Sequence, residues 1–197
     1  ELEQQMQTFI NLSFEKILST EQALSLLKKF ETVLVRDSLK SDLESKYTVI
    51  FQNYGLDLDE VQRLYEKQKL SPPLLRNAPP VTGNMLWSKQ LLRRIDEPMR
   101  RFKAHSSLTH NSKDAKKIVR TYNKVARALV EFETLWHTAW TKSIEAARSG
   151  LQATLIIRHP ITDHLFVNFD REILQLIREA KCLQRCKVEV PDVARMV

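Results

Sequence analysis

The sequence predicts a mainly α-helical protein: consecutive helical bundles with long antiparallel helices, a proline-rich connector and one small β-hairpin. Three observations support this fold class. Apolar residues recur at steps of three and four along most of the 197 residues, which is the spacing of helices that bury one face. Four prolines between Pro72 and Pro80 preclude a continuous helix there. After Gly150 the apolar period changes to two, which indicates strands.

Residues 1–70 are predicted to form a helical bundle segment. Three apolar stripes at helical spacing occur in this segment, and the third ends at Tyr54. Gly55 is expected to end that helix, because glycine readily adopts the positive φ of the residue that follows a helix. Asp57, with Glu60 three residues later, resembles a capping box, so another helix is expected to begin there.

Residues 71–83 are predicted to form an extended connector, because the residue before each proline also avoids helical geometry. Apolar side chains give this connector anchor points along a surface. Helix is expected to resume near Asn84 and to open a long-helix bundle over residues 84–149. Trp87 lies in the first helix of that bundle, and we expect its ring to be buried where the connector meets the helix.

The clearest helical pattern runs from about Asp114 to Arg148. Its apolar positions alternate steps of four and three, which keeps one stripe facing a neighbouring helix. We interpret Trp136 in this stripe, like Trp87 before it, as a structural anchor, because no convergent polar groups accompany it. The stripe consists of Ile118, Tyr122, Val125, Leu129, Phe132, Trp136 and Ala139.

Residues 150–197 are predicted to form a β-hairpin followed by a helix. Apolar positions alternate over residues 151–157 and again over 165–169, with turn residues between them. Asp170 is expected to cap the helix that follows. Because residues 190–192 begin another element and the first residue is not Met, we expect a longer chain that continues beyond these residues.

The net charge of +7 is concentrated in the middle of the chain. Residues 86–127 contain twelve basic and three acidic side chains, so this band carries +9 and the rest of the chain −2. Such a band can face nucleic acid, a membrane or an acidic protein, or it can be a solvated helical face. We favour the last two, because the aromatic residues and reader motifs of nucleic-acid-binding proteins are missing. The candidate partner-binding residues are Lys116, Lys117, Arg120, Lys124 and Arg127.

No catalytic, cofactor-binding or metal-binding residue can be nominated. The phosphate-binding GxxxxGKS/T, the dinucleotide-binding GxGxxG, the nucleophile elbow GxSxG and the zinc motif HExxH have no match. His159 and His164 flank the predicted turn, but a third metal ligand is missing. Cys182 and Cys186 are interpreted as reduced thiols. No stretch approaches the roughly 18 apolar residues that span a bilayer, so no membrane partner is expected. Nucleic acid is not expected as a partner either, because its reader motifs are missing.

Several segments resemble the N-terminal tail region of dynein heavy chains, and they look more like an axonemal than a cytoplasmic heavy chain. In that family a pattern close to PPVxGxIxWxxQLxxRI begins in the connector. Thr82, where the family often has Ala, and Asn84 depart slightly from the pattern and leave the subtype open. The similar segments are 64–69 (LYEKQK), 72–83 (PPLLRNAPPVTG), 86–95 (LWSKQLLRRI), 97–99 (EPM), 167–170 (VNFD) and 177–181 (IREAK).

The resemblance implies a structural and assembly role. Dynein heavy chains are microtubule-based motors whose AAA+ ring binds ATP and magnesium far from the tail. The tail is a string of helical bundles that holds intermediate and light chains, joins other heavy chains and anchors the complex, in cilia and flagella on the axonemal doublet microtubule. A non-enzymatic segment in the cytoskeleton of the cytoplasm, cilium or flagellum is therefore implied. From the residues alone, a basic helical nucleic-acid- or protein-binding module unrelated to motors is the alternative.

Overall fold

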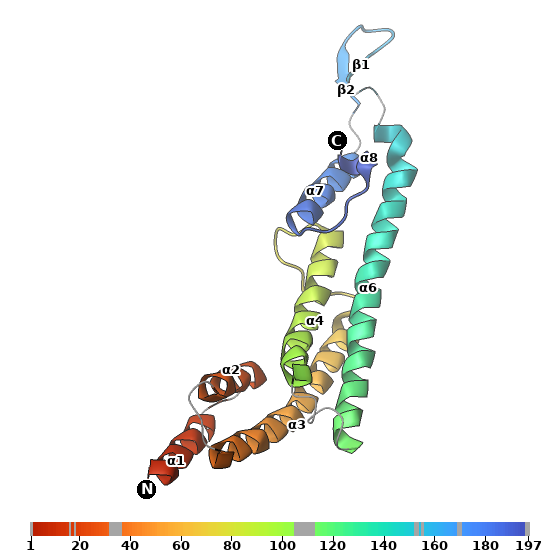
Figure 1. The fold of residues 1–197 in the computed structure, drawn as a ribbon. Coiled ribbons are helices and arrows are strands. Elements are labelled where there is room, and N and C mark those ends of the chain that lie inside the picture. The colour runs from red at the N-terminus through yellow and green to blue at the C-terminus, as the bar shows by residue number, and fades with distance from the viewer. Residues whose placement is uncertain are drawn as a thin grey trace. The chain divides into compact units, whose positions relative to one another are not determined.

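The computed structural model describes residues 2–15, 17, 19–31, 37–104, 113–151, 154, 156–168 and 171–195. Most of these residues are helical, and the predicted mainly α class with one β-hairpin is confirmed (Figure 1). None of the described helices is both long and apolar enough to cross a membrane. The elements are α1 (Leu2–Glu15), α2 (Thr20–Glu31), α3 (Asp37–Gln68), α4 (Pro80–Ala104), α6 (Lys113–Leu151), β1 (Ile156–Arg158), β2 (Leu165–Val167), α7 (Arg171–Arg185) and α8 (Asp192–Arg195).

The chain divides into two compact units. The first unit comprises Glu1–Lys69 and Leu91–Ala128, and the second comprises Leu70–Gln90 and Leu129–Val197. Helices α4 and α6 therefore each contribute residues to both units. The division that the sequence suggested, with boundaries after residues 70, 83 and 149, stays a prediction.

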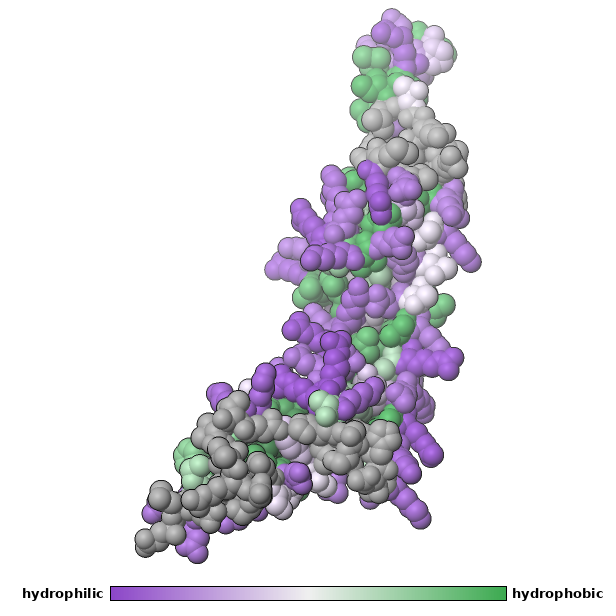
Figure 2. Space-filling model, in the orientation of Figure 1, coloured by the Kyte–Doolittle hydropathy of each residue, from purple (hydrophilic) through white to green (hydrophobic). Residues whose placement is uncertain are grey.

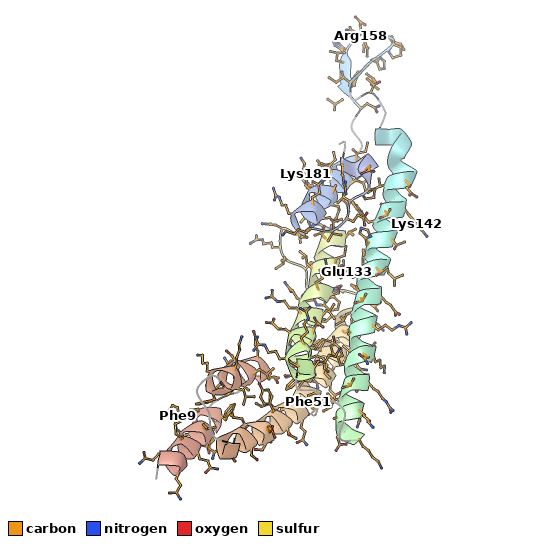
Figure 3. All side chains as sticks on the ribbon, in the orientation of Figure 1. Phe9, Phe51, Glu133, Lys142, Arg158 and Lys181 are labelled. Carbon is orange, nitrogen blue, oxygen red and sulfur yellow. The ribbon has the colours of Figure 1, made fainter. Side chains whose placement is uncertain are left out.

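Aromatic rings of α3 and α4 form the centre of the first unit. The ring centroids of Phe51 and Phe102 are 4.9 Å apart, and those of Tyr54 and Phe102 are 5.4 Å apart. Tyr54 is fully buried, and its hydroxyl donates a 2.6 Å hydrogen bond to the carbonyl of Ile95. Phe51 packs against Phe102, whereas Tyr54, three residues later on α3, bonds to Ile95, seven residues earlier on α4. The two segments are therefore antiparallel. Figure 3 shows Phe51 at this position on α3.

Helix α3 is continuous through Gly55, so the prediction that one helix ends there and another begins at Asp57 is wrong. Tyr54 and Leu58, on either side, are fully buried. Burial of two large side chains outweighs the roughly 1 kcal/mol that a glycine costs inside a helix. The Asp57 carboxylate accepts a 2.5 Å hydrogen bond from the Thr20 hydroxyl of α2 and does not cap a new helix.

Helices α4, α6 and α7 share the core of the second unit. Trp87 is 6% exposed, and its ring packs edge-on against that of Phe132, with centroids 5.5 Å apart. Trp136 is partly buried against the core cluster. Both tryptophans thus lie in packing positions. The buried members of the cluster are Met85, Trp140, Ile144, Ala180, Leu183 and Val190.

Helix α4 begins at Pro80, four residues before the predicted start at Asn84. This earlier start depends on a side chain of α7. The Glu179 carboxylate accepts hydrogen bonds from the amide of Val81 at 2.7 Å, from the amide of Thr82 at 2.9 Å and from the Thr82 hydroxyl at 2.6 Å. The first amides of a helix have no partner within it, so a carboxylate from another helix satisfies them and lets α4 start directly after the connector.

The predicted β-hairpin is confirmed, and its two strands are antiparallel, with Ile156 opposite Val167. An amide-to-carbonyl hydrogen bond of 2.9 Å from His159 to His164 closes the turn. Helix α6 extends to Leu151, so the strand begins later than the alternation of apolar residues suggested. All residues of both described strands are exposed, and Figure 2 shows apolar surface on the hairpin.

Helix α7 follows the hairpin, as predicted. Ile173, Ala180 and Leu183 are its buried apolar residues. The predicted cap, Asp170, and Phe169 of the predicted second strand lie outside the described residues.

Candidate partner-binding face

The basic residues singled out on α6 lie along one face of that helix. At 100° per residue they fall within an arc of about 100°. Ala115, Tyr122 and Val125 are buried and lie on the opposite side of the same stretch. Because the helix is held through its apolar side, the basic side chains point away from the packing. The set consists of Lys116, Lys117, Arg120, Lys124 and Arg127, and we call it the α6 basic face.

Most of the α6 basic face is not neutralised by the other residues that the structure describes. Lys116, Lys117, Arg120 and Lys124 are exposed, and none of them forms an ion pair or hydrogen bond with another described residue. Arg127 is also exposed but already interacts within the chain. The charge on the first half of this face is therefore available to an external anion.

The basic residues of α4 behave differently, because carboxylates neutralise most of them. Two of the acids, Asp96 and Glu97, lie on α4 itself, and Glu60 comes from α3. The fourth, Glu133, comes from α6, as Figure 3 shows. Lys103 lies over the ring of Tyr122, 5.2 Å from its centroid. The +9 band predicted from the sequence thus contains one neutralised set and one open set. The ion pairs are Arg93–Glu97 at 3.7 Å, Arg101–Glu97 at 3.6 Å, Arg100–Asp96 at 2.5 Å, Lys89–Glu133 at 3.2 Å and Arg94–Glu60.

A hydrogen bond between α6 and α4 fixes the orientation of the basic face in the first unit. The Tyr122 hydroxyl donates to Asp96 Oδ1 at 2.6 Å. This bond, with a further one from Arg100, lowers the pKa of Asp96 despite partial desolvation. Burial, together with the same bond, raises the pKa of Tyr122 to about 12. Tyr122 therefore stays protonated and Asp96 ionised at neutral pH, which is the combination that the contact requires.

The α6 basic face begins in the first turns of the helix, where the helix dipole disfavours cations. The amino-terminal end of a helix carries a partial positive charge, and Asp114 is the only acidic residue in the first turn of α6. Packing of Ala115 and Val125, which are 4% and 3% exposed, stabilises this end of the helix. Anions bound at this end would interact favourably with both the lysines and the helix dipole.

No metal centre emerges among the described residues, since no three His, Cys, Asp or Glu side chains are placed to hold one ion. The Nδ1 atom of His159 accepts hydrogen bonds from the amides of Ile161 and Thr162 at 3.3 and 3.2 Å, so this histidine is engaged in the hairpin turn. Cys182 and Cys186 are not in a disulfide, and burial raises the pKa of the Cys186 thiol.

The sequence of the chain matches a known protein family. Residues 1–197 match the family described as Dynein heavy chain, N-terminal region 1. The chain is 55% identical over 197 residues to the Dynein gamma chain, flagellar outer arm, of Chlamydomonas reinhardtii. It is 44% identical over 194 residues to Dynein axonemal heavy chain 5 of Mus musculus, and 45% identical over 194 residues to Dynein axonemal heavy chain 8 of Homo sapiens.

These alignments cover 98 to 100% of this chain and 4% of the length of each relative. The relatives carry flagellar or axonemal names, in agreement with the axonemal resemblance of the connector and its helix. The match to the amino-terminal region of the family also agrees with the tail assignment. The chain therefore belongs to the dynein heavy chain family and corresponds to its N-terminal region 1.

Proposed function

We propose that this chain is a structural and assembly segment in the tail of an axonemal dynein heavy chain, a microtubule-based and ATP-driven motor of cilia and flagella. The family match over residues 1–197 supports the tail assignment. The flagellar and axonemal names of the relatives support a location in the axoneme. ATP and magnesium act elsewhere in the full heavy chain, and this segment itself has no enzymatic role.

The α6 basic face is the observation that carries the assembly role. Lys116, Lys117, Arg120 and Lys124 form an exposed stripe without partners among the described residues, opposite a buried apolar side. An acidic surface on another subunit would complement this stripe. The proposed partner is an intermediate chain, a light chain or a second heavy chain, and the assembled tail anchors the motor on the doublet microtubule.

Reversal of charge on the α6 basic face tests this proposal. The heavy chain carrying Lys116→Glu, Lys117→Glu and Arg120→Glu together should co-purify with its tail partners at least about tenfold less, because like charges would then face each other across the interface. Circular dichroism of the 197-residue chain should stay unchanged, since the three side chains are exposed and lie outside the core.

A charge-conserving variant provides the matched control. Lys116→Arg, Lys117→Arg and Arg120→Lys retain the charge of the stripe and should retain the partners. Unchanged co-purification of the Glu variant would remove the interface role, and unfolding of that variant would show that the basic face supports the fold itself. Preferential binding of nucleic acid by the wild-type stripe, with the steep salt dependence of phosphate contacts, would favour the nucleic-acid-binding alternative.

A further inference from the structure

A second cationic surface occurs in the second unit, between the proline-rich connector and α7. It is an open groove of about 860 Å³. Connector residues 76–80 form one wall and the outer side of α7 forms the other. The residues that matter for its chemistry are Arg76, Pro79, Leu174, Arg178, Lys181 and Arg185.

The sequence of α7 separates its buried and its groove-lining sides. Ile173, Glu179 and Leu183 face the core of the unit and are 8%, 1% and 0% exposed. Positions 174, 178, 181 and 185 follow each other at steps of four and three and fall within an arc of about 60° on the other side. Figure 3 shows Lys181 on this helix. The groove wall is therefore a single helical stripe with one apolar and three cationic members.

The connector wall is fixed in place by the cap of α4. Glu179 binds the amides of Val81 and Thr82, directly after Pro80, and Glu179 belongs to the same helix as the groove stripe. The hydrogen bond from the amide of Ala78 to the carbonyl of Leu75, at 2.9 Å, closes a turn in the connector. The two walls are thus joined by hydrogen bonds, which makes the groove a preformed surface.

Charge in the groove has one sign. Arg76, Arg178, Lys181 and Arg185 are exposed, and none forms an ion pair with another described residue. Among the described residues that line the groove, none is acidic and none is aromatic. Elsewhere in the same unit, cations such as Lys89 and Arg158 have carboxylate partners. The groove is therefore complementary to an anionic ligand.

The spacing of the cations indicates an acidic polypeptide. Arg178 and Arg185 are about 10.5 Å apart along α7, at 1.5 Å per residue. This is close to the roughly 9.3 Å of one three-residue turn of polyproline II, in which side chains three residues apart lie on one face. Guanidinium groups bind carboxylates with two parallel hydrogen bonds. Pro79 and Leu174 offer apolar contacts to side chains between the carboxylates. The described lining residues include no aromatic side chain, so the groove lacks the main stacking surface of single-stranded nucleic-acid sites.

We propose that this groove binds an acidic segment of a protein partner in the extended polyproline II conformation, with carboxylates about three residues apart along the segment. Arg178 and Arg185 hold two of those carboxylates, and Arg76 closes over the segment from the connector. This site is separate from the α6 basic face and does not depend on the role proposed for that face.

Cys182 provides a local readout, because it lines the groove while Cys186, one turn later, does not. The experiment follows iodoacetamide alkylation of both cysteines by mass spectrometry in the whole heavy chain. The probe is a peptide of repeating Glu-Leu-Ser units. At about ten times its dissociation constant, the peptide should slow Cys182 alkylation about tenfold and leave Cys186 within about twofold. A Gln-Leu-Ser peptide should protect neither cysteine.

Two double charge reversals test whether the protection of Cys182 depends on the arginines of the groove. Arg178→Glu with Arg185→Glu should abolish the protection of Cys182, whereas Lys116→Glu with Arg120→Glu, which changes the net charge equally, should preserve it. Equal loss in both variants, or equal protection by the Glu and Gln peptides on the wild-type chain, would overturn the proposal. Stronger protection by an oligothymidylate of equal charge would also overturn it, since the groove would then prefer phosphate over a protein segment.

Discussion

The two units fix their packing with polar contacts of different kinds. In the first unit the neutral hydroxyl of Tyr54 donates to the carbonyl of Ile95. In the second unit the charged carboxylate of Glu179, which is 1% exposed, accepts from the amides of Val81 and Thr82. Both contacts join residues that are distant in sequence, 41 positions apart in the first case and 98 or 97 in the second.

The two contacts have different structural roles: one links two helices, and the other determines where a helix begins. The Ile95 carbonyl lies inside α4, where the helix already supplies a backbone partner, so Tyr54 adds a tether between two formed helices. The amides of Val81 and Thr82 lie in the first turn, where a helix supplies no partner. Glu179 therefore decides where α4 begins, and its charge also interacts favourably with the helix dipole.

Replacement of the Glu179 carboxylate should cause the largest loss of stability. Glu179→Gln keeps the size of the side chain but places an amide NH₂ against backbone donors and removes the charge. We expect a loss on the order of 3 kcal/mol in the free energy of unfolding, because charge-assisted hydrogen bonds to buried donors are lost. Chemical denaturation measures the loss. Amide hydrogen exchange should show that residues 81–83 lose protection first.

Glu145→Gln is the matched control, since Glu145 is an exposed carboxylate of the same unit. It should change the free energy of unfolding by less than about 0.5 kcal/mol. If Glu179→Gln proved equally mild, the start of α4 would be determined by Pro80 and local sequence, and the contrast between the two units would disappear.

Local patterns in the sequence predicted the features that depend on neighbouring residues. The steps of three and four on α6 identified Tyr122, Val125 and Leu129, all of which are buried, because periodic burial is a property of one helix. The alternation near residue 156 and the turn residues that follow identified the hairpin, because strand pattern and turn chemistry are also local in the sequence. The continuation of α3 through Gly55 escaped prediction, because the burial of Tyr54 against α4 decides it.

The sequence also could not predict which charged side chains are neutralised by residues distant in the sequence. Pairs such as Asp96 with Arg100 and Glu97 with Arg101 are four residues apart on α4 and are readable from the sequence. The partners that α3 and α6 supply to α4 are not readable, so the sequence could not separate the neutralised cations from the open ones. The groove escaped prediction because its walls, residues 76–80 and α7, are about a hundred positions apart.

The first unit also has a hydrogen bond to a carboxylate, from Tyr122 to Asp96. Its removal measures how much a charged acceptor contributes to stability within that unit. Tyr122→Phe removes the donor to Asp96. We expect a loss of about 1.5 kcal/mol at neutral pH, smaller than for Glu179→Gln because Asp96 is partly exposed and keeps Arg100. Denaturation of wild type and variant at matched pH values measures the loss.

The loss should depend on pH in two windows. The pKa of Asp96 is lowered in the folded chain, so its contribution is present above the unfolded value of about 3.9 and is lost as the pH falls through the folded value. The pKa of Tyr122 is raised to about 12, so its contribution is complete below about 10 and is lost as the pH rises towards 12. A difference between wild type and Tyr122→Phe that stayed constant through both windows would contradict this account.

The smallest loss of stability is expected when the neutral hydrogen bond of Tyr54 is removed. Tyr54→Phe retains the ring, whose centroid lies 5.4 Å from that of Phe102, and removes only the hydroxyl. The Ile95 carbonyl keeps its place in α4, so no strongly destabilised group is left behind, and we expect a loss of about 1 kcal/mol in the free energy of unfolding. Amide exchange of residues 81–83 in the second unit should be unchanged.

Comparison of Tyr54→Phe with Glu179→Gln decides whether charge or burial sets the size of these effects. Both side chains are almost fully buried, at 0% and 1% exposure, and both hydrogen bonds cross between helices. A loss of about 3 kcal/mol in both variants would mean that burial alone sets the cost. A loss of about 3 kcal/mol in Glu179→Gln against about 1 kcal/mol in Tyr54→Phe would mean that the start of α4 is the weak point of the fold, because a single amide oxygen then faces first-turn amides that have no partner within the helix.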